Sequence, residues 1–193
     1  MFGNQRSINL LDKVISFVKK HKKNNIKLIY FPPATLINLF NKKLNTSQIE
    51  VGAQNCHPNE KYGAYTGQIN SYMLKDAGAK YIILGHSENR QFGDSDNIIN
   101  LKIRSSINSG LKVIFCIGET LNQKRKKNTK KVLLKQITQG LKNIKNKKNI
   151  IIAYEPVWSI GSGLIPKETE IFEIVKFIKN KLNGSKVLYG GSV

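Results

Sequence analysis

The segment Asn149-Ile-Ile-Ile-Ala-Tyr-Glu-Pro-Val-Trp-Ser-Ile-Gly-Ser-Gly163 decides the fold, because a continuous apolar run leads directly into a polar exit. The run Asn149–Tyr154 predicts a strand that is buried on both faces, as in a parallel sheet. Five further runs are rich in Ile and Val or flanked by turn signals: Ile26–Phe31, Gln48–Gln54, Lys80–Leu84, Lys112–Ile117 and Lys186–Tyr189. The runs begin about 22 to 37 residues apart, which is the repeat of a strand followed by a helix.

Helical periodicity fills the intervals between these runs. Apolar residues recur at three- and four-residue spacing in four segments: Ile8–Val18 behind a possible Ser7 cap, Ile98–Ile107, Val132–Ile144 and Ile171–Leu182. The alternation predicts an α/β fold with a parallel sheet covered by helices. Periodicity leaves open whether the sheet closes as an eight-stranded barrel or stays open and doubly wound.

Composition narrows the class of protein. A chain of 193 residues with 40% hydrophobic residues predicts a single domain over residues 1–193. No apolar run reaches the ~18 residues that cross a bilayer, and the N-terminus lacks a signal sequence, so we expect a cytoplasmic protein. The two cysteines, Cys56 and Cys116, are too far apart for a CxxC metal or redox unit. The net charge of +20 raises the possibility of nucleic-acid binding. Only Lys124–Lys131 forms a dense basic patch, however, and no aromatic residues that could stack on bases interrupt it.

The strand exits carry the candidate catalytic residues, since active groups in such folds follow the carboxyl ends of strands. Glu155 follows a strand and precedes Pro156, which makes it a candidate base for taking a proton next to a carbonyl. His86 stands ahead of a possible helical turn, which would lower its pKa and leave a neutral imidazole that polarises a carbonyl.

Small residues dominate the segment behind Glu155. Their arrangement around two bulky residues predicts a mobile lid, made of Pro156, Val157, Trp158, Ser159, Ile160, Gly161, Ser162 and Gly163. Backbone N–H groups of Gly161, Gly190, Gly191 and Ser192 could bind a phosphate.

Three segments, Tyr81–Arg90, Ala153–Gly163 and Tyr189–Val193, resemble signature segments of the triosephosphate isomerase family in order and spacing. Shorter likenesses in Val113–Glu119, Gly52–Cys56 and Gly63–Gly67 extend the resemblance along most of the chain. It implies a TIM (β/α)₈ barrel and an aldose–ketose isomerase that interconverts dihydroxyacetone phosphate and glyceraldehyde 3-phosphate, a step of glycolysis and gluconeogenesis. It also implies that neither a metal nor an organic cofactor takes part.

The resemblance further implies a role for each matching residue. Glu155 would move the proton while neutral His86 polarises the carbonyl, a pairing that general accounts of pKa tuning use as an example. The supporting residues would be Ser87, which holds Glu155 in the open state, Glu88, which contacts the family's catalytic lysine, and Cys116. Gly161, Gly191 and Ser192 would bind the phosphate, Tyr189 and Ser192 would latch the lid, and Thr66 would enter a neighbouring subunit of a homo-oligomer.

The sequence departs from the family pattern at both ends. The family begins with a strand that ends in Asn-x-Lys-Met, and Met1 aligns with that methionine, so we expect the first strand and its lysine to be missing. A rival alignment would make Arg6 the substitute cation, although few residues precede Asn4 to form a strand. Beyond Val193 the family continues through an eighth strand. We therefore expect an incomplete barrel of about six strands, with oligomerisation covering the open edges and weak or undetectable activity.

Two other functions remain open at this point. The chain could be a non-catalytic barrel fragment that persists as an oligomeric scaffold. It could also be a basic nucleic-acid-binding α/β protein, whose affinity would fall steeply with salt.

Overall fold

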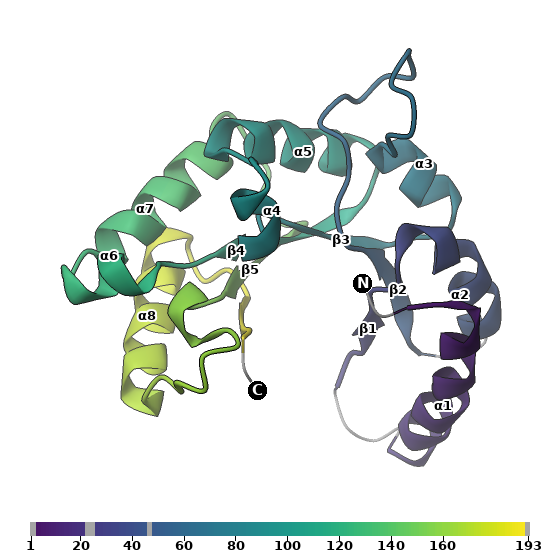
Figure 1. The fold of residues 1–193 in the computed structure, drawn as a ribbon, viewed down its shortest axis with the longest axis horizontal. Helices are drawn as coiled ribbons and strands as arrows, with labels where there is room; N and C mark the ends of the chain where they lie inside the picture. Colours follow the sequence, from purple (N-terminus) through teal and green to yellow (C-terminus); the bar gives the residue numbers. More distant parts are fainter. Residues whose placement is uncertain (1–2, 22–25, 46–47, 192–193) are drawn as a thin grey trace. The chain divides into compact units, whose positions relative to one another are not determined.

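The computed structural model describes residues 3–21, 26–45 and 48–191, which form two compact units (Figure 1). The first unit comprises residues 1–83 and 105–112, and the second comprises residues 84–104 and 113–193. Each unit alternates strands and helices, as the sequence pattern predicts. The expected single domain stays a prediction.

The first unit contains strands β1 (Ile29–Tyr30), β2 (Glu50–Ala53) and most of β3 (Tyr81–Leu84), which pair in parallel in chain order. Ile29 is in register with Glu50, and Gly52 with Tyr81. The helical elements are η1 (Gln5–Asn9), α1 (Leu10–Lys20), η2 (Ala34–Leu36), α2 (Ile37–Leu44) and α3 (Ser71–Asp76). Phe40 of α2 is fully buried, and α2 packs against β2.

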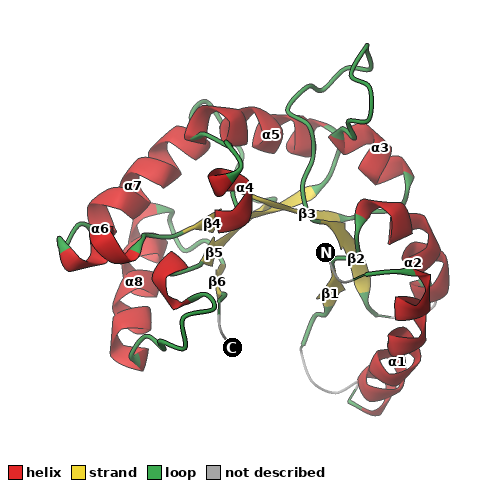
Figure 2. Ribbon diagram, in the orientation of Figure 1, coloured by secondary structure: helices red, strands yellow, loops and turns green. Residues whose placement is uncertain are grey.

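The second unit contains strands β4 (Lys112–Ile117), β5 (Ile150–Tyr154) and β6 (Val187–Tyr189), again parallel and in chain order. Its helical elements are α4 (Ser87–Gln91), most of α5 (Asp96–Asn108), α6 (Leu121–Arg125), α7 (Thr129–Gly140), η3 (Val157–Ser159) and α8 (Glu168–Lys181). Helices α7 and α8 lie on one side of the three strands (Figure 2). The buried side chains of Phe115, Leu133, Ile152 and Ile178 form the core between these layers.

Element boundaries differ from the sequence-based expectation at three places. Asn4, and not Ser7, caps the first helical segment: the Asn4 side chain accepts from Arg6 N–H, and Ser7 completes a capping box from the third position. The third periodic segment ends early, because α7 stops at Gly140, so that Leu141 and Ile144 lie in a turn. The short helices α2, α3 and α6 have no counterpart among the four predicted helices.

Within the described ranges, no helix is long and apolar enough to cross a membrane. The same residues contain no group of three or more His, Cys, Asp or Glu side chains that could hold a metal ion.

Candidate functional site

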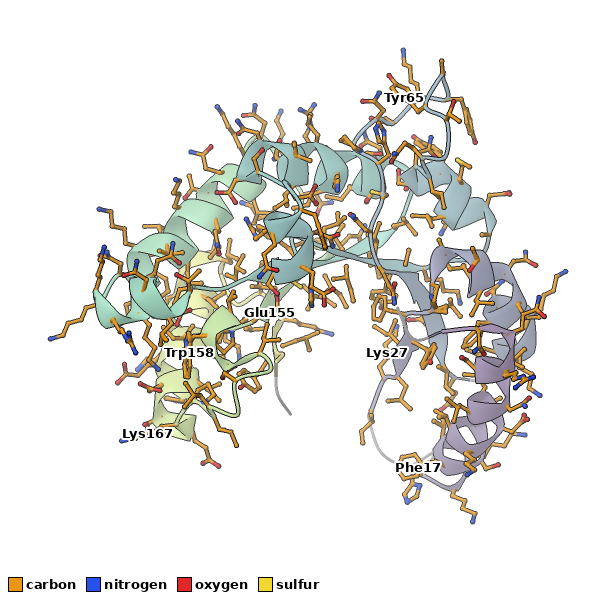
Figure 3. All side chains as sticks on the ribbon, in the orientation of Figure 1. Phe17, Lys27, Tyr65, Glu155, Trp158 and Lys167 are labelled. Atoms are coloured by element: carbon orange, nitrogen blue, oxygen red, sulfur yellow. The ribbon has the colours of Figure 1, made fainter. Side chains whose placement is uncertain are left out.

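Glu155 begins the polar exit of β5, and its backbone is fixed on both sides. Its N–H donates to the carbonyl of Ile117 at 2.8 Å, which extends the β4–β5 ladder by one residue, and Pro156 follows it. The side chain is 8% exposed. The end of β5 therefore holds the Glu155 carboxylate in a nearly buried position; the residue is labelled in Figure 3.

Three donors surround this carboxylate, and all come from the segment after β3. His86 Nε2 lies 2.9 Å from Oε1 of Glu155. The Ser87 hydroxyl donates to Oε1 at 3.2 Å, and the Ser87 backbone N–H donates to Oε2 at 3.1 Å. The structure thus brings together Glu155 from the exit of β5 with His86 and Ser87 from the exit of β3.

The imidazole of His86 is subject to two opposing influences. Its Nδ1 accepts from the Glu88 backbone N–H at 3.3 Å at the start of α4, which favours a neutral ring with its proton on Nε2. The hydrogen bond to Glu155 favours the charged ring and outweighs partial burial, so the pKa of His86 is raised above its ordinary value. The expectation of a lowered His86 pKa is therefore wrong for this arrangement, because it considered the helical turn and not the carboxylate.

Cys116 lies beneath the site at the end of β4. Burial, reinforced by the charge of Glu155, raises the pKa of its thiol to about 12, against a smaller opposing effect of Arg90. Cys116 is therefore a protonated thiol at neutral pH and not a nucleophile. Arg90 ties the surrounding backbone together: it donates to Gly85 O at 2.8 Å and to Cys116 O at 3.4 Å.

Glu119, to which the sequence pattern assigned no role, anchors the beginning of the predicted lid. Its carboxylate is buried and accepts from the Tyr154 hydroxyl at 3.2 Å and from Trp158 Nε1 at 2.9 Å. Lys124 Nζ lies 3.6 Å from the centroid of the Trp158 ring. The same nitrogen forms an ion pair with Oε2 of Glu170 at 3.0 Å. The signal for Glu119 was its place in the polar exit of β4, two residues past the end of the strand.

The rest of the predicted lid runs out from this anchored beginning. Ser159 is fully buried and donates to Pro156 O at 2.9 Å, whereas Ile160 is 39% exposed and Gly161 to Gly163 are exposed. Gly161 has a φ of +64°, a conformation that favours glycine. The lid therefore has a firmly packed beginning and an exposed tip.

The residues expected to bind phosphate and latch the lid are described in part. Gly191, with a φ of +137°, passes so close to Ser159 that a Cβ there would lie 3.2 Å from the Ser159 hydroxyl. The Tyr189 hydroxyl is buried and has no hydrogen-bond partner among the described residues. Ser192 lies outside those residues.

Two further predicted site residues are exposed. The Glu88 side chain is 78% exposed, with Oε2 at 3.8 Å from His86 Nδ1. Thr66 is exposed in the long loop between β2 and α3, which also carries Tyr65, labelled in Figure 3. Its predicted contact with a neighbouring subunit stays a prediction.

Comparisons with known proteins point to one family. The sequence model of the family "Triosephosphate isomerase" matches residues 1–193. The triosephosphate isomerase of Thermodesulfovibrio yellowstonii is 40% identical over 98% of this chain and 79% of its own length. That of Geotalea uraniireducens is 39% identical over 97% of this chain and 78% of its own length.

A solved structure extends this similarity to three dimensions. The crystal structure of triosephosphate isomerase from Bartonella henselae matches with a TM-score of 0.89 and 34% identity, over 100% of this chain and 80% of that one. The fold is accordingly an incomplete TIM (β/α)₈-type barrel whose described residues supply six parallel strands, as the sequence predicted. With a family match along its whole length and relatives at 40% identity, this chain belongs to the triosephosphate isomerase family.

Proposed function

We propose that the chain interconverts dihydroxyacetone phosphate and glyceraldehyde 3-phosphate, with Glu155 as the base and His86 as the electrophile. The observation that carries this proposal is the buried contact between the Glu155 carboxylate and the His86 imidazole, 2.9 Å apart at the ends of parallel strands. A carboxylate and an imidazole are the two groups that proton transfer next to a carbonyl needs.

The contacts of the free site suggest how the reaction begins. Glu155 is held by Ser87 and His86, and it must turn away from them to reach a substrate carbon. That turn releases the Nε2–H of His86, which then donates to the substrate carbonyl oxygen. It also removes the main influence that raises the His86 pKa, so the ring becomes neutral as it begins to act.

The chemical step then balances within the substrate. Glu155 takes a proton from C1 of dihydroxyacetone phosphate while His86 stabilises the developing charge on the C2 oxygen. The protonated Glu155 returns a proton to C2, and the hydroxyl proton moves between the two oxygens through His86. We assign the phosphate to the N–H groups of Gly161, Gly191 and Ser192, and lid closure to the segment from Pro156 to Gly163.

Solvent deuterium exchange tests this proposal at high sensitivity. Dihydroxyacetone phosphate incubated with the protein in D₂O should gain deuterium at carbon, detected by proton NMR even when net turnover is slow. Glu155→Gln should abolish the exchange, and His86→Asn should slow it by about 10²–10³-fold. Exchange that persists unchanged in Glu155→Gln would rule out Glu155 as the base.

Sedimentation measured beside the exchange assay distinguishes an active oligomer from a non-catalytic scaffold. Salt-dependent binding to DNA or RNA would instead favour the nucleic-acid alternative.

A further inference from the structure

A glutamine of α7 contacts the backbone next to the catalytic base. The Gly118 N–H donates to Gln136 Oε1 at 2.9 Å, and Gln136 Nε2 donates to the Gly118 carbonyl at 3.0 Å. One side-chain amide thus satisfies both backbone groups of a residue just past the end of β4, as a neighbouring strand would.

Gly118 is the centre of a three-residue segment that holds the exit of β5. On one side of it the Ile117 carbonyl accepts from Glu155 N–H at 2.8 Å, and on the other the Glu119 carbonyl accepts from Val157 N–H at 3.1 Å. Between these bonds the Glu155 carbonyl oxygen lies directly against Gly118, where any Cβ would collide with it. The position of the Glu155 backbone therefore depends on that of Gly118.

We infer that Gln136 is a positioning residue for the reaction: it clamps Gly118 from both sides and so fixes the strand exit that carries Glu155. This inference rests on the proposed function in naming Glu155 as the base, whereas the clamp itself is a matter of geometry. A side-chain clamp suits this place because Gly118 lies beyond the paired residues of β4. The Gln136 amide there supplies the two hydrogen bonds that a neighbouring strand would otherwise supply.

His86 provides a readout that does not require activity. Its pKa is raised chiefly by the hydrogen bond to Glu155, with a smaller contribution from Glu88. If loss of the clamp displaces Glu155, the His86 pKa must fall, which an NMR titration of the imidazole measures directly. The other two histidines, His21 and His57, belong to the first unit and serve as internal references.

Two substitutions remove the clamp in different ways. Gln136→Met keeps the length and removes the amide, whereas Gln136→Asn keeps the amide and shortens its reach. Both should lower the His86 pKa and slow deuterium exchange by about 10²-fold, since a misplacement of about 1 Å costs this much. Gln139→Met makes the same change three residues further along α7 and should leave the His86 titration and the exchange rate as they are.

The outcomes separate the clamp from the proposed function. A lowered His86 pKa in either folded Gln136 variant supports the clamp, even if Glu155→Gln shows that the chain does not exchange substrate protons. A His86 titration equal to that of the unmodified chain overturns the clamp, even if Glu155→Gln confirms the base. Lower thermal stability with an unmoved His86 titration also overturns it, because Gln136 would then support only the fold.

Discussion

At the residue scale, Glu155 and His86 each determine the state of the other. The carboxylate raises the His86 pKa, so the folded chain binds that proton more tightly than the unfolded chain does. The resulting stabilisation is fully present below the unfolded pKa of about 6.5 and is lost as pH rises through the higher folded value. The contact between Glu155 and His86 therefore stabilises the fold most at a pH where the imidazole is charged. A charged imidazole cannot act as the neutral electrophile.

This linkage predicts the pH dependence of a substitution. Glu155→Gln should lower the free energy of unfolding more at about pH 5.5 than at about pH 9, because only the charged imidazole gains from the carboxylate. Urea unfolding of both proteins at the two pH values measures the difference. Glu88→Gln is the control: its side chain is 78% exposed and 3.8 Å from His86, so its pH-dependent effect should be smaller. An equal loss at both pH values for Glu155→Gln would contradict the linkage.

Gly118 makes a second prediction at this scale. Gly118→Ala should destabilise the protein by about 1–3 kcal/mol or more, because the added methyl collides with the Glu155 carbonyl oxygen. Gly190→Ala is the matched control, since nothing lies within 4 Å of a Cβ there. Chemical denaturation of the two variants should give clearly different midpoints, and equal midpoints would show that Gly118 has room to move.

Sequence reasoning identified the residues that their neighbours in the sequence mark, and it missed those whose role depends on contacts made only in the folded chain. Glu155 and His86 follow apolar runs, and the local pattern suffices to single them out. Gln136 acts through a backbone far from it in sequence, and its one local signal is polarity on the helix face that carries buried Leu133 and Gly140. The raised pKa of His86 was missed for the same reason, because the Glu155 contact is made only in the folded chain.

At the element scale, the predicted lid divides into an anchored base and an exposed tip. Buried Glu119 accepts hydrogen bonds from Tyr154 on β5 and from Trp158 on the lid, so the strand and the lid share one carboxylate. Burial and, to a smaller extent, the charge of Glu119 raise the pKa of Tyr154, which keeps the phenol protonated as a donor. Opening and closing is therefore expected to pivot beyond this anchor, in the glycine-containing tip.

Tyr154→Phe tests the anchor. Loss of a hydrogen bond to a charged, buried group should reduce the free energy of unfolding by about 1.5–3 kcal/mol. It should also change the fluorescence of Trp158, the only tryptophan in the sequence, because the Glu119 carboxylate that accepts from Trp158 is less constrained without the Tyr154 hydroxyl. Tyr72→Phe is the control: it removes a hydroxyl of the first unit that donates to Glu60 Oε1 at 3.2 Å, and it should alter neither the Trp158 emission nor the exchange reaction.

Elements were predictable in proportion to their length and burial. The six apolar runs locate all six strands of the described chain, because a strand covered on both sides, as β3, β4 and β5 are, must be continuously apolar. Helix α6, with five residues, is too short to show periodicity, and its capping box at Thr120 was its only local signal. Ser7 was mistaken for a cap because the 3₁₀ segment ahead of α1 starts three residues earlier than the apolar pattern.

At the scale of the whole molecule, charge is the dominant feature. The chain has 32 basic and 12 acidic residues, so 20 basic side chains cannot have a carboxylate of their own. Two of these carboxylates, Glu119 and Glu155, are also committed to buried site contacts. Self-repulsion of this size destabilises a compact state and is weakened by salt.

The melting temperature should therefore rise as NaCl increases from about 0.02 to 0.2 M, where the screening length falls from about 20 to 7 Å. Lys131→Glu provides a matched test on α7, where Lys131 and Lys135 are exposed and four residues apart near the helix start. Replacing a like-charged pair with Glu–Lys at this spacing, close to the positive end of the helix dipole, should raise the low-salt melting temperature by about 1–2 °C. The gain should shrink as salt is added, because screening has by then removed the repulsion that the substitution relieves. A melting temperature that falls with salt in the unmodified chain would mean that its ion pairs, such as Lys27–Glu50 and Lys102–Asp94, outweigh the repulsion among its unpaired lysines.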